Sequence, residues 1–170
     1  MTTIDDYLNN WLRDAHAAEE QAETMLSTAS DRLKDYPDLA NRIRQHQDET
    51  TNQRKLLEEC LERRGTSTST TKDLMAKTSA MFQDMGKAMA GDEVVKTVLF
   101  SYAFEQMEIA SYRILVTAAE AAGDQQTRSV CERILQEEIA MADWLQQHSD
   151  AITRQFLSRE ADTTARSARA

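Results

Sequence analysis

Residues 105–112 read EQMEIASY and place two carboxylates, Glu105 and Glu108, inside a long apolar stretch. The apolar side chains around them recur at three- and four-residue spacing, so both glutamates fall on the face that a helix would bury. An ionised carboxylate is strongly disfavoured in an apolar interior unless a proton, a cation or hydrogen bonds satisfy it. The stretch therefore predicts a buried helix that carries a polar site.

The composition predicts one all-α domain. The chain has 170 residues, of which 41% are apolar, and it contains one proline and four glycines. Its net charge of -9 argues against binding to nucleic acids or anionic membranes, because both require a basic face. The first residues show no signal-peptide pattern, and no apolar run is long enough to span a membrane, so we expect a cytoplasmic protein.

The apolar spacing predicts four long helices in two antiparallel hairpins. Pro37 suits the first turn of a helix, whereas Gly65 and Gly123 suit the positions that follow helix ends. Each hairpin link is short, but the segment from residue 66 to residue 90 is long enough to cross the bundle, and we expect it to contain a short helix. Apolar residues near the C-terminus predict a short final helix. The domain is thus expected over residues 1–157, followed by a polar, mobile tail over residues 158–170.

The two predicted hairpins resemble two copies of one duplicated unit. Sliding the sequence on itself by 89 residues maps Glu19 onto Glu108 and Glu49 onto Glu138. Glu108 and Glu138 are each about 22 Å from their hairpin turn, at the rise of an α-helix, so they can meet. A single inward glutamate is more often a boundary residue with a solvated head. Four inward glutamates at similar heights along the bundle favour a shared binding site instead.

Four inward carboxylates, one from each helix, can bind two divalent metal ions, because anionic oxygens offset the cationic charge and can bridge two ions. His46 precedes Glu49 by one helical turn, and His16 precedes Glu19 in the same way. His16 is more typical of a hydrogen-bonded boundary residue than of a ligand. The candidate metal ligands are Glu19, Glu49, Glu105, Glu108, Glu138 and His46.

The chain resembles the ferritin-like YciE/YciF family in four segments. They are LRDAHAAEEQAE at residues 12–23, the region of residues 46–49, FEQMEIASYR at residues 104–113 and LQEEIAMADWL at residues 135–145. The resemblance implies a ferritin-like four-helix bundle, a bacterial stress-associated protein and a metal site. The usual ferritin-like pattern has histidine three residues after two of its glutamates, but here Asn52 and Met141 occupy those positions.

Two functional hypotheses follow. The first is a dimetal carboxylate protein that binds two iron or manganese ions and acts in oxidative or general stress, by ferroxidase or peroxide-consuming chemistry. Tyr102 or Tyr112 would then donate hydrogen bonds to the ligands. The second is a non-catalytic helical bundle that acts through self-association or partner binding, as a homodimer or larger homo-oligomer, with its glutamates protonated or hydrogen-bonded.

Overall fold

The computed structural model describes residues 1–30, 33–68 and 91–169, and within these ranges every regular element is a helix. The all-α prediction is therefore confirmed. None of these helices is sufficiently long and apolar to cross a membrane. The elements are α1 (Ile4–Ser30), α2 (Pro37–Arg63), α4 (Glu93–Ala121) and α5 (Gln125–Ser167).

The helix boundaries lie where the proline and glycine residues predict them. Pro37 is the first residue of α2, where its missing N–H costs no hydrogen bond. Gly65 and Gly123 follow α2 and α4 with φ angles of 70° and 72°, a left-handed conformation that glycine adopts without strain. Asp124 then caps α5, because its side chain accepts a hydrogen bond of 3.0 Å from the backbone N–H of Thr127. These short links fold each helix pair into a hairpin.

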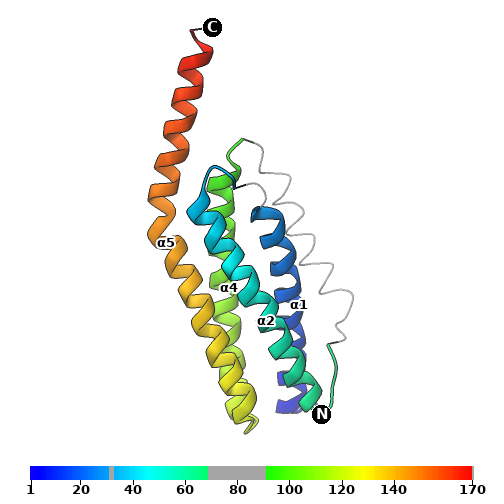
Figure 1. The fold of residues 1–170 in the computed structure, drawn as a ribbon. Helices are drawn as coiled ribbons and strands as arrows, with labels where there is room; N and C mark the ends of the chain where they lie inside the picture. Colours follow the sequence, from blue (N-terminus) through cyan, green and yellow to red (C-terminus); the bar gives the residue numbers. More distant parts are fainter. Residues whose placement is uncertain (31–32, 69–90, 170) are drawn as a thin grey trace.

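The two hairpins form a four-helix bundle (Figure 1). α1 packs chiefly against α2, and α4 packs chiefly against α5; the hairpins meet through contacts of α1 with α4 and of α2 with α5. α2 ends at one end of the bundle and α4 begins at the other, as the predicted crossover requires. The short helix predicted within this crossover lies outside the described residues.

The core consists of two apolar clusters with a polar layer between them. Each helix contributes residues to both clusters, and one or more buried polar residues of each helix, among them Glu19, His46, Glu108 and Glu138, fall between the two sets in the sequence. One cluster is formed by Leu8, Leu12, Ala15, Leu57, Leu61, Tyr112, Leu115, Ala118, Ala119, Cys131 and Ile134. The other is formed by Leu26, Leu33, Tyr36, Leu39, Ala40, Ile43, Val94, Val98, Met141, Leu145 and Ile152. The polar layer is therefore held at mid-bundle by packing on both sides.

α5 continues without a break through the residues for which the sequence predicts a separate final helix. No glycine or proline interrupts it, and it projects beyond the other helices (Figure 1). Ile152 packs into the second cluster. Arg159 Nη2 lies 2.6 Å from Oδ2 of Asp35, in the link between α1 and α2. Residues 158–167 are helical and exposed, whereas the mobility expected of this tail stays a prediction.

Candidate metal centre

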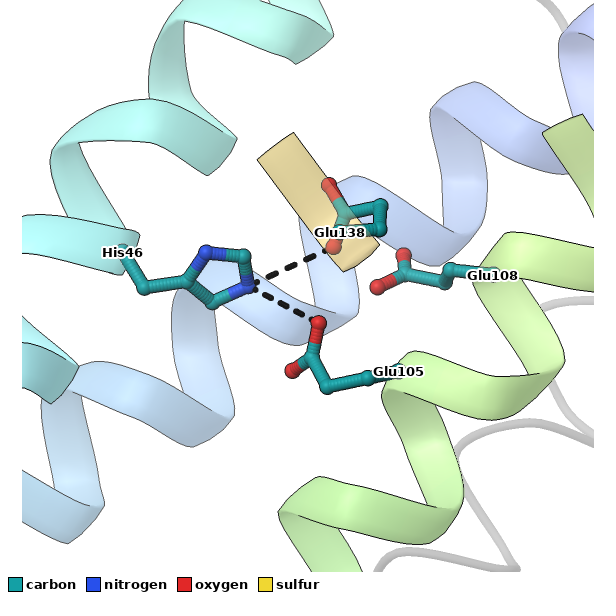
Figure 2. A group of neighbouring side chains, drawn as sticks. All are labelled: His46, Glu105, Glu108 and Glu138. Atoms are coloured by element: carbon teal, nitrogen blue, oxygen red, sulfur yellow. Dashed lines mark ion pairs between the residues drawn. The ribbon is translucent and has the colours of Figure 1, made fainter. Parts of the chain in front are cut away.

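Four acidic and imidazole side chains converge in the polar layer (Figure 2). Each offers one nitrogen or oxygen atom, and these atoms all lie within 4.8 Å of one another. The residues are His46 on α2, Glu105 and Glu108 on α4, and Glu138 on α5. All four are buried, and their side chains point toward a common centre (Figure 2).

The spacing along α4 explains why one helix supplies two of these groups. Glu105 and Glu108 are three residues apart, so they lie on the same side of the helix, one turn from each other. Val98 on one side and Tyr112 on the other belong to the two apolar clusters and fix the face that α4 presents. Residues 105–112 therefore bring both carboxylates to the centre, as their periodicity predicts.

His46 is the cationic member of the group. Its Nε2 lies 3.2 Å from Glu105 Oε2 and 3.5 Å from Glu138 Oε2. Burial alone would lower the pKa of this imidazole, but the negative charge and hydrogen bond of Glu105, with smaller effects of Glu49 and Glu138, raise it to about 10. The protonated ring thus offsets part of the negative charge of the carboxylates.

Glu49 lies on the outer side of the His46 ring and is not one of the four converging groups. Its Oε2 is 3.0 Å from His46 Nδ1 and 3.2 Å from Arg42 Nη1, and 23% of its side chain is exposed. Partial burial would raise the pKa of Glu49, but the hydrogen bond from His46 and the charge of Arg42 lower it to about 2. The inward face of α2 carries Thr50 and Gln53, which are both buried.

Glu19 is buried on α1 and is held by Tyr112, whose hydroxyl donates a hydrogen bond to Glu19 Oε1. Burial raises the pKa of Glu19 to about 8, although this hydrogen bond and the charge of His46 act in the opposite direction. Burial, followed by the charge of Glu19, also raises the pKa of Tyr112 well above its ordinary value. Glu19 therefore lies beside the group of four without belonging to it.

The remaining carboxylates are crowded together. Burial is the main cause that raises the pKa of Glu108, and the charges of Glu19, Glu138 and Glu105 add to it. Burial likewise raises the pKa of Glu138 against the lowering effect of His46. Gln53 orients Glu138 by donating a hydrogen bond of 2.6 Å to its Oε1. Nothing in the sequence marked the Gln53 amide as part of a site.

The oxygen and nitrogen atoms of this polar layer are suited to bind a divalent cation. Among the described residues, Glu19 Oε2, Glu108 Oε1 and Gln53 Oε1 are buried and have no hydrogen-bond partner. Acceptor atoms that are buried without a donor are costly, and a cation satisfies several of them at once. One imidazole with carboxylate oxygens is a ligand set suited to iron or manganese.

The other residues that the sequence raises as possible ligands or hydrogen-bond donors do not belong to this group of four. His16 is buried, but it is not among the four converging groups. The Tyr102 hydroxyl is 3.5 Å from Gln146 Oε1, so of the two predicted tyrosine donors only Tyr112 reaches a candidate ligand. Asn52 is exposed, and Met141 is packed in an apolar cluster, so neither takes the place of the missing histidine.

The chain matches, over residues 3–158, the family described as "Domain of unknown function (DUF892)". It is similar to a protein of Xanthomonas campestris of known structure, at 43% identity and a TM-score of 0.81, over 94% of this chain and 99% of that one. It is also similar to the Escherichia coli stress protein YciF, at 22% identity and a TM-score of 0.80, over 91% of this chain and 99% of that one.

A further structural match is the bacterioferritin of Desulfovibrio desulfuricans, which has a diiron site. The identity is 20% and the TM-score 0.74, over 95% of this chain and 91% of that one. This match and the one to YciF establish a shared ferritin-like fold. The chain belongs to the DUF892 family, and the resemblance to the YciE/YciF family is confirmed.

Proposed function

We propose that this DUF892 protein binds divalent metal ions, iron or manganese, in the polar layer of its bundle. The ligands would be His46, Glu105, Glu108 and Glu138. The observation that carries the proposal is the convergence of one atom from each of these four buried side chains within 4.8 Å. Without a metal ion, burial and the crowding of acidic groups raise the pKa of Glu108 and Glu138.

A second ion, as in a dimetal carboxylate site, would draw on Glu19. Glu19 Oε2 is buried without a hydrogen-bond partner in the described part of the chain, and after burial the charge of Glu19 is among the causes that raise the pKa of Glu108 and Glu138. Glu108 and Glu138 would help to hold both ions together with Glu19, since each carboxylate has two oxygens. Two ions with one imidazole would therefore share an oxygen-rich site.

Iron or manganese held in this way would supply redox chemistry toward dioxygen or peroxide. The residues of the chain would bind the ions, exclude bulk water through the two apolar clusters, and hold a proton at the Tyr112 hydroxyl beside Glu19. Such chemistry suits a ferroxidase or a peroxide-consuming protein in oxidative or general stress. The stress protein YciF, which shares the fold, supports this setting.

Metal binding is tested by titrating Mn²⁺ into protein freed of metal, with the wild type compared with Glu105→Gln/Glu138→Gln. The wild type is expected to bind one to two ions per chain and the double variant to bind with an affinity reduced by a factor of about one hundred. Glu62→Gln/Glu132→Gln, which changes two exposed glutamates on α2 and α5, is the matched control. Equal affinities for all three proteins would contradict a site at this layer.

We also propose that the chain self-associates, because it has an exposed apolar face. Leu99, Met107 and Ile114 are exposed on one side of α4. Beside them, a groove of about 530 Å³ lies between α1 and α4. Trp11 and Ile114 line it, and a second copy of the chain could cover it.

Analytical ultracentrifugation tests this self-association. The wild type should form a dimer at about 100 µM, a concentration at which weak dimers form, and Ile114→Glu should convert the dimer into a monomer. A wild type that is monomeric at this concentration would contradict the proposal.

A further inference from the structure

We infer that Glu49 is a positioning residue that holds the His46 ring with Nε2 toward the metal and the ring proton on Nδ1. This inference rests on the proposed metal site and replaces the ligand role that the sequence predicts for Glu49. Its basis is that the two ring nitrogens of His46 face opposite surroundings. Nε2 faces Glu105 at 3.2 Å and Glu138 at 3.5 Å, whereas Nδ1 faces Glu49 at 3.0 Å.

The position of Glu49 separates it from the ligands. Glu49 is 23% exposed, while the His46 side chain is 1% exposed and shields the centre from it. The imidazole ring therefore lies between the Glu49 carboxylate and the carboxylates of α4 and α5. A carboxylate on the far side of a ligand ring cannot bind the same ion directly, but it can fix the ring.

Glu49 is itself held from two directions. Arg42 Nη1 donates to its Oε2 over 3.2 Å, and Gln45 Nε2 donates to its Oε1 over 2.9 Å. These three residues and His46 lie on α2, so a single rigid helix carries the whole arrangement. The acceptor that faces Nδ1 is thus fixed in place before any ion binds.

This arrangement has a chemical consequence for the ring. An ionised carboxylate accepts but cannot donate a hydrogen bond, so the nitrogen that faces it must carry the proton. The cationic ring carries a proton on both nitrogens, whereas the neutral ring that binds a metal ion would keep the proton on Nδ1, beside Glu49, and present the lone pair of Nε2. Such a carboxylate–histidine–metal chain fixes the tautomer and increases the basicity of the ligand nitrogen. Glu49 would therefore raise metal affinity while acting only through His46.

A double-mutant cycle with Co²⁺ as the probe tests whether Glu49 acts on metal affinity through His46. Glu49→Gln should weaken Co²⁺ binding to otherwise wild-type protein by a factor of about 10 to 100. In the His46→Ala background the same substitution should have no further effect. Glu59→Gln, an exposed glutamate on the same helix, is the matched control and should leave Co²⁺ binding unchanged.

Three outcomes overturn the inference. A loss of affinity by the same factor in both backgrounds would make Glu49 an independent ligand, and no loss in either would leave it without a role in binding. Both results would leave the proposed metal site intact, because the wild type would still bind Co²⁺. A wild type that binds no Co²⁺ would remove the proposed function and this inference together.

A spectroscopic measurement on the wild type makes the test independent of how well the variants fold. In ¹⁵N-histidine-labelled, Zn²⁺-loaded protein, the long-range ¹H–¹⁵N spectrum shows which ring nitrogen carries the proton. The His46 signals, assigned by their loss in His46→Ala, should show the proton on Nδ1. A proton on Nε2 would contradict the positioning role of Glu49.

Discussion

Tyr112 on α4 donates a hydrogen bond to Glu19 on α1, across the interface that joins the two hairpins. Both residues are buried, and the bond lies next to the group of His46 and three glutamates. It fixes one oxygen of Glu19 and leaves the other, Oε2, without a hydrogen-bond partner among the described residues. The polar layer is therefore tied together across the bundle as well as along each helix.

We predict that the metal-free protein loses stability as the pH rises from 5 to 8. The pKa of Glu19 is raised to about 8 from an ordinary 4.5, so over most of this range the folded chain keeps a proton that the unfolded chain has largely released. His46, whose pKa is raised to about 10 from 6.5, acts in the same direction above pH 6.5. The measurement is the urea midpoint in EDTA at pH 5, 6.5 and 8. Glu19→Gln should flatten the decline, and a midpoint that increases with pH would contradict the prediction.

Glu108→Gln should stabilise the metal-free protein at pH 7.5 and weaken its metal binding. The substitution keeps the shape but removes a carboxyl group whose pKa is raised by burial and by its acidic neighbours. We expect a gain of about 1 kcal/mol in the free energy of unfolding and a tenfold loss in Mn²⁺ affinity. Thermal unfolding in EDTA and a Mn²⁺ titration check the two effects. Glu120→Gln, which is exposed on the same helix, should change neither.

Tyr112→Phe should destabilise the protein by about 1–3 kcal/mol, because it leaves a buried carboxylate oxygen without its donor. The loss should be larger at pH 8 than at pH 5, since the hydrogen bond favours the ionised form of Glu19. Urea unfolding at both pH values measures it. Tyr7→Phe, which changes an exposed tyrosine on α1, is the control. Equal losses at both pH values would mean that the Tyr112 hydroxyl does not act on the charge of Glu19.

Histidines introduced at residues 52 and 141 should not improve metal binding, although the usual ferritin-like pattern places histidines there. Asn52 is exposed, so Asn52→His should leave Zn²⁺ affinity unchanged. Met141 is fully buried in an apolar cluster, so Met141→His should cost about 2 kcal/mol or more in stability. Zn²⁺ titration and thermal unfolding separate these effects. A tenfold gain in affinity for the folded double variant would show that α2 is rotated relative to this structure.

Much of the fold could be predicted because local signals were strong. Gly65, Gly123 and Pro37 mark helix ends by the backbone conformations that they favour, and the structure places helix ends beside them. Glu105 and Glu108 lie within an apolar stripe of three- and four-residue spacing, although α4 also carries exposed apolar residues. The burial of both glutamates in the structure agrees with the periodicity.

The rotation of α2 could not be predicted in the same way. The middle of its inward stripe is polar, so apolar periodicity does not distinguish the face of Glu49 and Leu56 from the face of Thr50 and Leu57. In the structure Thr50 and Leu57 are buried, whereas Glu49 and Leu56 are partly exposed. The 89-residue repeat favoured Glu49 because it aligned a carboxylate with Glu138. Packing against the neighbouring helices instead turns His46 toward the centre.

The continuity of α5 also could not be predicted from the residues of the helix itself. Apolar residues become sparse after Leu145, which predicts an end to the helix and a separate short one. In the structure Ile152 belongs to the same apolar cluster as Leu33 and Tyr36 of the link between α1 and α2, and Gln155 donates a hydrogen bond of 3.1 Å to the backbone carbonyl of Asp35. Contacts between residues so distant in the sequence extend the helix, and they have no signature in the helix itself.

The most direct test of the metal site is a crystal soaked in Mn²⁺ and measured by anomalous scattering. The expected result is a strong anomalous peak bounded by His46 Nε2 and the carboxylates of Glu105, Glu108 and Glu138, with a second peak on the side of Glu19 if two ions bind. Glu105→Gln/Glu138→Gln crystals treated in the same way should lose the peak. A wild-type crystal with no peak in this layer, at a Mn²⁺ concentration that gives peaks on the surface, would contradict the metal site.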